Sequence, residues 1–411
     1  MSQIQTFRRL LRERPAFRWV WCAQIISLIG DWLSYIAVSL ISIERGDGAL
    51  AVAWVLAAHA LPMAIMSPIG GPLADRYDRR RILILSSVGA SGLTLMMWWV
   101  SEVSVTLLHV MLFLRVCISS IGSTARSAAI PQMVEADDLH SANALLGLTW
   151  SITFALGLAL GGFAASFLGP SGAILLDAAT FLVAVSIYAQ LPSLKPDIQG
   201  DRAPRPGFAD MWVAWTYVAQ RRRHMATLWA KSPAMMANAG GWVTLTLVAS
   251  ERMSWVDVSI ALGLMHTVRA IGTGIGPLMP ERFIPRSPFV GPPCVFLGVG
   301  LFAFSSHPLG MWLGLFIWGC GGGHNWVCTT ASLQSQTPRH LMGRVSGLDF
   351  LLLSLSETVC ALAGAWVVDH TGYSEACAFS GVLVGLLLWV WLVWWKKAAR
   401  PAKSTGGDVV R

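Results

Sequence analysis

Charged side chains lie inside several long apolar stretches of this sequence, where a charge is costly and usually marks function. Asp31, Arg115, Arg269 and Glu357 fall near the middle of their stretches. A buried carboxylate beside an arginine can take up and release a proton, because burial favours the neutral acid and the arginine favours the carboxylate. Asp31 and Glu357 are therefore candidate proton carriers. Arg115 and Arg269 are candidate partners for them, or contacts for an anionic group.

These charges also have a purely structural interpretation. Buried ion pairs often hold helices in register without taking part in any reaction. Each half of the chain contains one central acid and one central base, and Asp31 with Arg115 is the first pair that we expect. Asp177 lies nearer one end of its stretch, and Lys231 nearer the other.

The elements that position these charges are predicted to be membrane-spanning helices. The 411 residues are 55% hydrophobic and only 13% charged, with a mean hydropathy of +0.58, whereas about a quarter of the residues of a globular protein are charged. An apolar stretch of about 20 residues can cross a bilayer as a helix. Twelve such stretches are predicted, starting near positions 16, 50, 81, 105, 143, 171, 224, 257, 286, 310, 345 and 374.

The distribution of basic residues predicts the orientation. Most of the 30 Lys and Arg residues lie in segments that share one side if the N-terminus is cytoplasmic, and the outer loops hold only Arg45 and Arg252. Basic residues in short loops stay on the cytoplasmic side. We expect a multi-pass protein of the inner (plasma) membrane with both termini in the cytoplasm. The net charge of +8 is explained by this topology and by membrane lipids, without nucleic acid.

The stretches divide into two sets of six. We expect an amphipathic cytoplasmic N-terminus at 1–15, a six-helix half at 16–191, a cytoplasmic linker at 192–223, a second half at 224–395 and a basic tail at 396–411. No small-residue cleavage site follows the first stretch, so we expect an uncleaved anchor.

A dense charge cluster follows the second stretch. Residues 71–83 read GPLADRYDRRRIL, and residues 276–282, in the second half, read GPLMPER. Both copies end the second span of their half, as a duplicated six-span unit requires.

With these motifs, the chain resembles the major facilitator superfamily of transporters. The family loop pattern G-x-L-A-D-R-x-G-R-[RK] is matched except at its second glycine, where Asp78 stands. Segments typical of the enterobactin-exporter and macrolide-efflux branch are GDW at 30–32, ADRYDRRR at 74–81, ANAL at 142–145, GGGHNW at 321–326 and GRV at 343–345. The resemblance implies an all-α membrane fold with twelve transmembrane helices in two pseudo-symmetric halves. It also implies a cytoplasmic gate made by Gly71, Asp75, Arg76, Arg79 and, in span 11, Asp349.

The family's antiporter motif G-P-x-x-G-G is kept only in part. Gly157, Gly161 and Gly162 match it, but Leu158 replaces the proline. Glycines at this spacing also let membrane helices approach closely, so helix packing is an equal explanation for them.

The glycine-rich run 319–323 lies just before Asn325 and Trp326. We expect these glycines to thin or break the helix and expose backbone to a cavity. Asn325 and Trp326 are therefore candidate substrate contacts. His59 and His266 have no second ligand at metal spacing, and we interpret them as packing or lining residues.

The sequence contains no nucleotide-binding, metalloprotease or hydrolase motif, so no enzymatic activity is predicted. The expected function is secondary, proton-coupled export of a small amphipathic molecule (a drug, a macrolide-like compound or a siderophore) by alternating access. The alternatives are gradient-driven import and a non-transporting sensor. The expected partners are the substrate, protons and lipids, with no metal and no cofactor beyond the proton gradient. A monomer is the family default.

Overall fold

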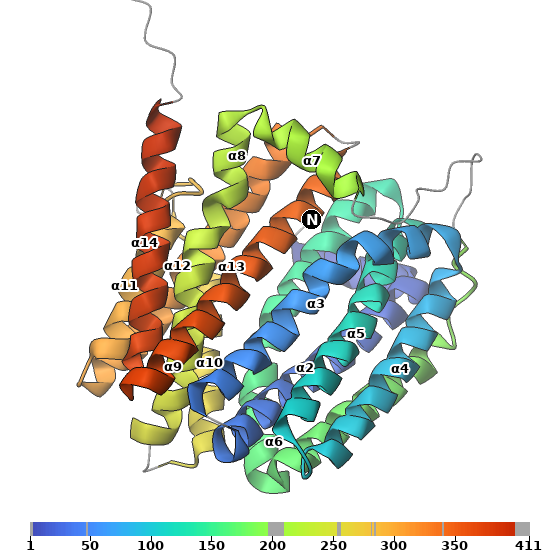
Figure 1. The fold of residues 1–411 in the computed structure, drawn as a ribbon. Coiled ribbons are helices and arrows are strands. Elements are labelled where there is room, and N and C mark those ends of the chain that lie inside the picture. Colours follow the sequence, from blue (N-terminus) through green and yellow to red (C-terminus); the bar gives the residue numbers. More distant parts are fainter. Residues whose placement is uncertain are drawn as a thin grey trace, which may run out of the picture.

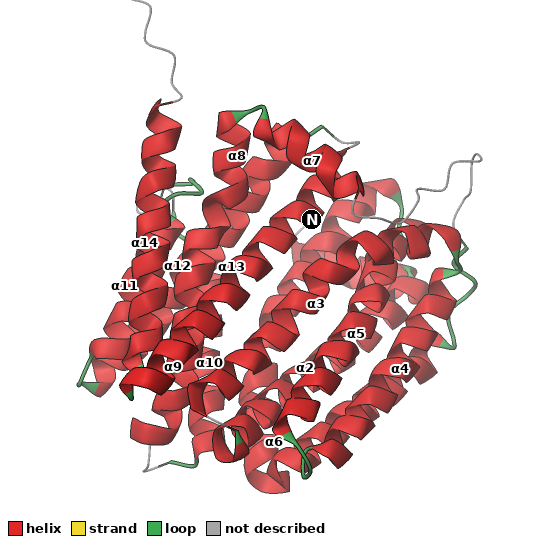
Figure 2. Cartoon of the chain, in the orientation of Figure 1, coloured by secondary structure: helices red, strands yellow, loops and turns green. Residues whose placement is uncertain are grey.

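In the computed structural model, the described residues form helices joined by loops and turns, and none of them forms a strand (Figure 2). Those residues are 3–46, 48–195, 209–252, 256–280, 282, 285–338 and 341–398. Long apolar runs favour helices because a helix satisfies its own backbone hydrogen bonds, as lipid requires. The all-α fold class predicted from the sequence is confirmed.

Two bundles of helices lie side by side (Figure 1). The N-terminal bundle contains α2 (Pro15–Arg45), α3 (Gly48–Arg76), α4 (Arg79–Val100), α5 (Val105–Met133) and α6 (Leu139–Tyr188), and follows α1 (Gln3–Glu13). The C-terminal bundle contains α8 (Arg222–Leu228), α9 (Ser232–Arg252), α10 (Val258–Ile275), α11 (Gly291–Phe304), α12 (Pro308–Gln336), α13 (Met342–Thr371) and α14 (Glu375–Ala398).

Helix length and hydropathy recognise fewer membrane spans than the twelve that the sequence predicts. Among the described residues, fourteen α-helices are present, and eight are long and apolar enough to cross a membrane. One of the eight, α6, is two helices joined at Gly169, whose φ of 72° suits a residue without a side chain. The predicted count of twelve is therefore not established by helix length and hydropathy alone.

The two ends of the bundles differ in charge. The "basic end" carries α1, the loop at Arg76–Arg81 and the last turn of α14; the "far end" carries Arg45, Gly169 and Asp369. At the basic end, α1 buries Leu10 against the N-terminal bundle, and its Arg9 contacts Asp138 at 2.5 Å. The amphipathic helix predicted at the N-terminus is therefore present.

Part of the predicted linker is helical. Residues 196–208 lie outside the described residues, but α7 (Ala209–Ala219) follows them. Its Ala214 and Val218 are buried in an apolar cluster with Leu333 and Val345. This segment therefore packs on the basic end of the C-terminal bundle.

At the far end, a carboxylate of one bundle caps a helix of the other. Asp369 of α13 accepts hydrogen bonds from the backbone nitrogens of Ala49, at 2.7 Å, and Leu50, at 3.2 Å, in the first turn of α3. A helix N-terminus has unpaired N–H groups and a partial positive charge, so an anion stabilises it. Gly48, with a φ of 69°, gives the carboxylate room, since a Cβ there would lie 2.3 Å from Asp369 Oδ1.

A second contact between the bundles depends on glycine. α6 and α10 touch through their backbones at Gly162 and Gly263: a Cβ on Gly162 would lie 2.4 Å from the carbonyl oxygen of Ser259. Gly157 and Gly161 similarly bring α6 against Trp32 and Ile36 of α2. Close packing, one of the two explanations offered for these glycines, is what the structure shows.

Substituting Gly162 by alanine should destabilise the protein, because the new methyl group meets backbone that cannot move away. Overpacking of this kind typically costs about 1–3 kcal/mol. Gly147, on the same helix, faces open space, so Gly147→Ala should instead stabilise by about 0.5–1 kcal/mol through helix propensity. Thermal unfolding of both variants in detergent tests this; equal effects would contradict it.

Substituting Asp369 by alanine should loosen the far end. Loss of a helix cap costs about 1 kcal/mol, which changes a two-state ratio about fivefold. Spin labels at Val103→Cys and Tyr373→Cys, exposed far-end positions on opposite bundles, would report a longer or broader distance distribution. Asp369→Asn, which retains a capping oxygen, should resemble the wild type. Identical distributions in wild type and Asp369→Ala would show that the cap does not hold this end.

Candidate functional site

Arg115 of α5 lies at the centre of a buried ion cluster in the N-terminal bundle. It forms a salt bridge with Asp31 of α2, and its Nη1 is 3.6 Å from Asp177 Oδ2 of α6. Arg115 and Asp177 are fully buried, whereas the Asp31 side chain keeps 21% of its surface exposed. The predicted pair of Asp31 and Arg115 is confirmed, and Asp177 joins it as a third member that the sequence analysis did not assign to the pair.

The backbone at Gly30 allows this cluster to form. A Cβ there would lie 2.1 Å from Thr180 Oγ1 and 2.5 Å from Asp177 Oδ1, so only glycine lets α6 approach α2 at this level. Two carboxylates face one guanidinium, which leaves one excess negative charge when both are ionised. An uncompensated buried charge is expensive, so this excess charge requires compensation nearby.

The acid and the base of the C-terminal bundle are bridged by an amide. Asn238 Nδ2 donates to Glu357 Oε1 at 2.8 Å, and Arg269 Nη1 donates to Asn238 Oδ1 at 3.2 Å. Trp318 Nε1 donates to the same Asn238 oxygen at 3.1 Å. Glu357 and Arg269 are therefore linked by hydrogen bonds through Asn238, a residue that the sequence analysis did not single out.

Aromatic rings from both bundles surround Arg269. Its guanidinium lies over Trp242 at 4.0 Å, Trp318 at 5.0 Å and Phe154 at 5.2 Å. Phe154 belongs to the N-terminal bundle, so this stack joins the two. The rings of Tyr35 and Trp242 also meet across the interface, with centroids 5.6 Å apart. We call Tyr35, Phe154, Trp242, Arg269 and Trp318 the interface cluster.

The two histidines interpreted above as packing or lining residues lie against the interface cluster. His59 packs on Tyr35 at 5.5 Å, and His266 packs on Trp242 at 4.7 Å. Among the described residues, no group of three or more His, Cys, Asp or Glu side chains could hold a metal ion. The packing role inferred for these two histidines agrees with their positions.

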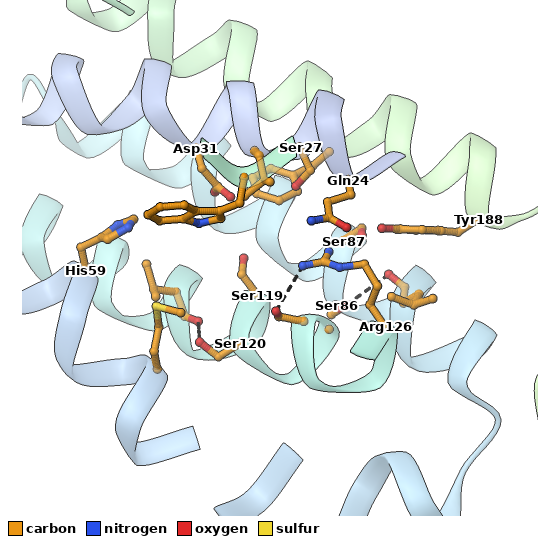
Figure 3. A pocket seen from close by; sticks show the side chains of 18 residues that line it. Gln24, Ser27, Asp31, His59, Ser86, Ser87, Ser119, Ser120, Arg126 and Tyr188 are labelled. Atoms are coloured by element: carbon orange, nitrogen blue, oxygen red, sulfur yellow. Dashed lines mark hydrogen bonds between the residues drawn. The ribbon is translucent and has the colours of Figure 1, made fainter. Parts of the chain in front are cut away.

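A polar cavity of about 160 Å³ opens beside Asp31 within the N-terminal bundle. Arg126 reaches into it between Gln24 and Ser119, and Tyr188, the last residue of α6, marks its limit toward the basic end (Figure 3). His59 and Trp150 line its opposite side, toward the interface cluster. The lining includes the hydroxyl groups of Ser27, Ser86, Ser87, Ser119, Ser120 and Ser123.

Pairs of serines within the spans are a weak sequence signal for this cavity, and they were not among the predicted site residues. Serine doublets occur at 86–87 and 119–120, in the middle of apolar spans. Serine is easily overlooked in a span because its hydroxyl can bond to its own helix; Ser120 donates to Val116 at 2.7 Å, for example. Arg126 is one of the basic residues that the sequence analysis assigns to the cytoplasmic side, but the structure places it in the cavity.

The residues of the predicted gate lie at the basic end. Arg79 is buried, and its Nε donates to the carbonyl of Ala74 at 3.1 Å. Arg76 is exposed and lies over the ring of Tyr77 at 5.9 Å. Gly71 lies in α3 with open space beside it, and the side chain of Asp75 lies outside the described part of the structure.

Asp349, the expected partner of this gate, is bound within its own bundle. Its Oδ2 lies 2.5 Å from Lys231 Nζ, and both residues are buried. The Lys231 ammonium also lies 4.4 Å from the ring of Trp326. In this conformation Asp349 is therefore neutralised by a lysine of the C-terminal bundle.

The expectation that glycines break span 10 is wrong. α12 runs without interruption from Pro308 to Gln336. Its glycines instead let backbones touch: a Cβ on Gly319 or Gly323 would lie 2.0 Å from a carbonyl oxygen of α10. Asn325 is fully buried against Gly291 of α11, while Trp326 is partly exposed beside Lys231. The two candidate substrate contacts therefore do not share one site.

Asp78, the departure from the family loop pattern, has a structural role. It caps α4 through the backbone nitrogen of Arg80, at 3.0 Å, and ties the loop to Ser193 Oγ, at 2.8 Å, and Leu194 N, at 2.9 Å. Partial burial raises the pKa of Asp78, but these hydrogen bonds and Arg81 outweigh burial and lower it.

Asp78→Ala should therefore lower the melting temperature at neutral pH, by the equivalent of about 1 kcal/mol for a lost cap. A carboxylate with a lowered folded-state pKa stabilises above its ordinary value of 3.8 and loses that effect as pH falls through the folded value. The difference between wild type and variant should shrink in that acidic range. Melting curves from pH 7 downward test this, and a constant difference at every pH would contradict it.

Comparison with known proteins bears on this arrangement of buried charges and bundles. The chain is 26% identical to the enterobactin exporter EntS of Salmonella typhi over 409 residues, with 92% of each chain covered, and 25% identical to that of Citrobacter koseri, with 97% covered. Its fold is similar to a nucleoside transporter, NupG (TM-score 0.73, 12% identity, 93% of this chain and 99% of that one). It is also similar to an auto-inhibited POT family peptide transporter (TM-score 0.74, 14% identity, 96% and 99% covered).

These likenesses cover nearly the whole chain, and they agree with the motifs at 71–83 and 30–32. The model of the Major Facilitator Superfamily matches residues 20–357. The protein belongs to the major facilitator superfamily and is a membrane transporter.

Proposed function

We propose that this protein is a secondary transporter that couples proton movement to export of a small amphipathic molecule by alternating access. The observation that carries the proposal is the cluster of Asp31, Arg115 and Asp177 beside a polar cavity. The similarity to enterobactin exporters supports export, with a siderophore as the first candidate cargo.

The surroundings of Asp31 support proton uptake at this residue. Asp31 lines the cavity, whereas Asp177 is sealed from it. Protonating Asp31 would release Arg115 to pair more closely with Asp177, so the charge state and the packing of α2 against α5 and α6 are linked. The other ionisable groups that line the cavity around Asp31 are His59, Arg126 and Tyr188.

Alternating access requires each end to open in turn. In this conformation the far end is held by the Asp369 cap and by the contact of Gly162 with α10. Opening the far end would expose the first turn of α3, and the free energy lost with these contacts must be regained by new contacts elsewhere. We propose that the new contacts form at the basic end, where Asp349 leaves Lys231 and pairs with the charged loop at 71–83.

Orientation and span number complete the proposal. With the basic end in the cytoplasm, the positive-inside rule is satisfied. Counting α6 as two helices and adding α9, α11 and α12 to the spans recognised by hydropathy gives twelve crossings of the inner membrane.

Transport in proteoliposomes tests the coupling step, with enterobactin as the probe. Asp31→Asn should reduce uptake driven by a pH gradient by about tenfold or more, since each 1.36 kcal/mol lost is tenfold. Exchange of enterobactin at equal concentrations on both sides, which needs no gradient, should persist. Glu357→Gln tests the second acid in the same way.

Glu102→Gln is the matched control, because Glu102 is an exposed far-end acid paired with Arg45 at 2.6 Å. It should transport like the wild type. Undiminished pH-driven uptake in both Asp31→Asn and Glu357→Gln would overturn proton coupling through these residues.

A further inference from the structure

Arg126 has an unusual environment for a charge inside a membrane protein. Its Nη2 donates to Ser123 Oγ at 3.1 Å, and none of the described carboxylates forms an ion pair with it. Guanidinium offers five N–H donors in a planar fork. An ionisable residue within a membrane span is by default a candidate for a functional site, because such a charge is expensive to keep there.

The surroundings of Arg126 are polar and incompletely paired. Gln24 is buried and its Oε1 has no hydrogen-bond partner in the protein, nor has the hydroxyl of Ser119. Both residues line the cavity on either side of Arg126 (Figure 3). Buried polar groups are nearly always hydrogen-bonded, so these groups indicate that the cavity receives a polar ligand.

The size of the cavity limits what enters it. Sites for drug-sized ligands usually measure about 300–1,000 Å³, and this cavity is about 160 Å³. It therefore holds a head group and not a whole cargo molecule. Trp150 and Met63 lie at its apolar side, and Trp150 stacks on Phe154 of the interface cluster at 5.2 Å.

The charge balance selects the sign of the head group. When the cluster of Asp31, Arg115 and Asp177 holds one proton it has no net charge, and Arg126 then supplies the uncompensated charge in the cavity. A cationic head would meet that charge without a free carboxylate to bind. An oxyanion would gain charge-assisted hydrogen bonds, which are about twice as strong as neutral ones.

We propose that Arg126 and the serines around it bind the anionic head of an amphipathic cargo, while its apolar part extends past Trp150 toward the interface cluster. This inference rests on the proposed function and narrows its substrate class to acidic compounds such as carboxylates. Cationic drugs are thereby excluded as cargo of this site.

Two probes that share a ring and differ in charge test the proposal. Binding of 1-naphthoate and of 1-naphthylmethylammonium to the purified full-length protein in phosphatidylcholine nanodiscs is measured by calorimetry. We expect naphthoate to bind and the ammonium compound to bind at least about tenfold more weakly. Arg126→Gln should weaken naphthoate about tenfold or more, in line with a lost charge-assisted pair, and Arg126→Lys should weaken it less.

Arg81→Gln is the control for loss of a positive charge at the basic end, because Arg81 is exposed and does not line the cavity. Its affinity for naphthoate should match the wild type. Ser119→Leu fills the cavity without changing charge, and it should also abolish naphthoate binding. This second variant tests the proposal even if Arg126→Gln fails to fold. Ser127→Leu, at an exposed position of α5 that does not line the cavity, should leave binding intact.

An anionic lipid could supply the same chemistry, so the measurement is repeated with phosphatidylglycerol in the nanodiscs. Persistence of naphthoate binding assigns the site to cargo, and its loss would assign the site to a lipid head group and overturn the proposal. No naphthoate binding, equal binding of both probes, or equal effects of Arg126→Gln and Arg81→Gln would also overturn it. Proton coupling fails separately, by its own transport assay, if Asp31→Asn and Glu357→Gln keep their pH-driven uptake.

Discussion

A single guanidinium shared by two carboxylates is the interaction on which the N-terminal bundle depends. Arg115 draws Asp31 of α2 and Asp177 of α6 toward α5, and Gly30 removes the side chain that would keep α2 and α6 apart. Charges in this setting must be compensated locally, since the surrounding lipid provides no water. The cluster has one acid more than it has bases, and its Asp31 is the member that lines the polar cavity.

The two bundles compensate their buried charges in different ways. In the C-terminal bundle the acid and the base are held apart by Asn238, and Arg269 is covered by aromatic rings, including one from the opposite bundle. The interface between bundles thus includes aromatic contacts and backbone contacts at Gly162 and Gly263.

Much of the candidate site was predictable from residue type and position. Intramembrane charges are rare enough that Asp31, Arg115, Arg269 and Glu357 stood out, and the first pair formed as expected. Other residues of the candidate site could not be recognised in the sequence, for physical reasons. Serines that bond to their own helix look like ordinary span residues, Arg126 looked like one more topological charge, and the Asn238 bridge has no sequence spacing that identifies it. The glycines of α12 were misread because glycine permits either a break or a close approach, and neighbouring helices decide which.

Hydropathy and the cost of a buried charge are properties of single segments, so the amino-acid sequence was sufficient to predict the membrane class, the all-α fold, the family motif and the identity of the buried charges. Which charges meet, where the polar cavity lies and which residues join the two bundles became visible only in the folded protein. Those features depend on contacts between residues far apart in the chain, such as Asp369 with Ala49 and Asp177 with Arg115. Segments that are each stable as helices can pack in more than one way, and only their packing places a carboxylate beside its partner.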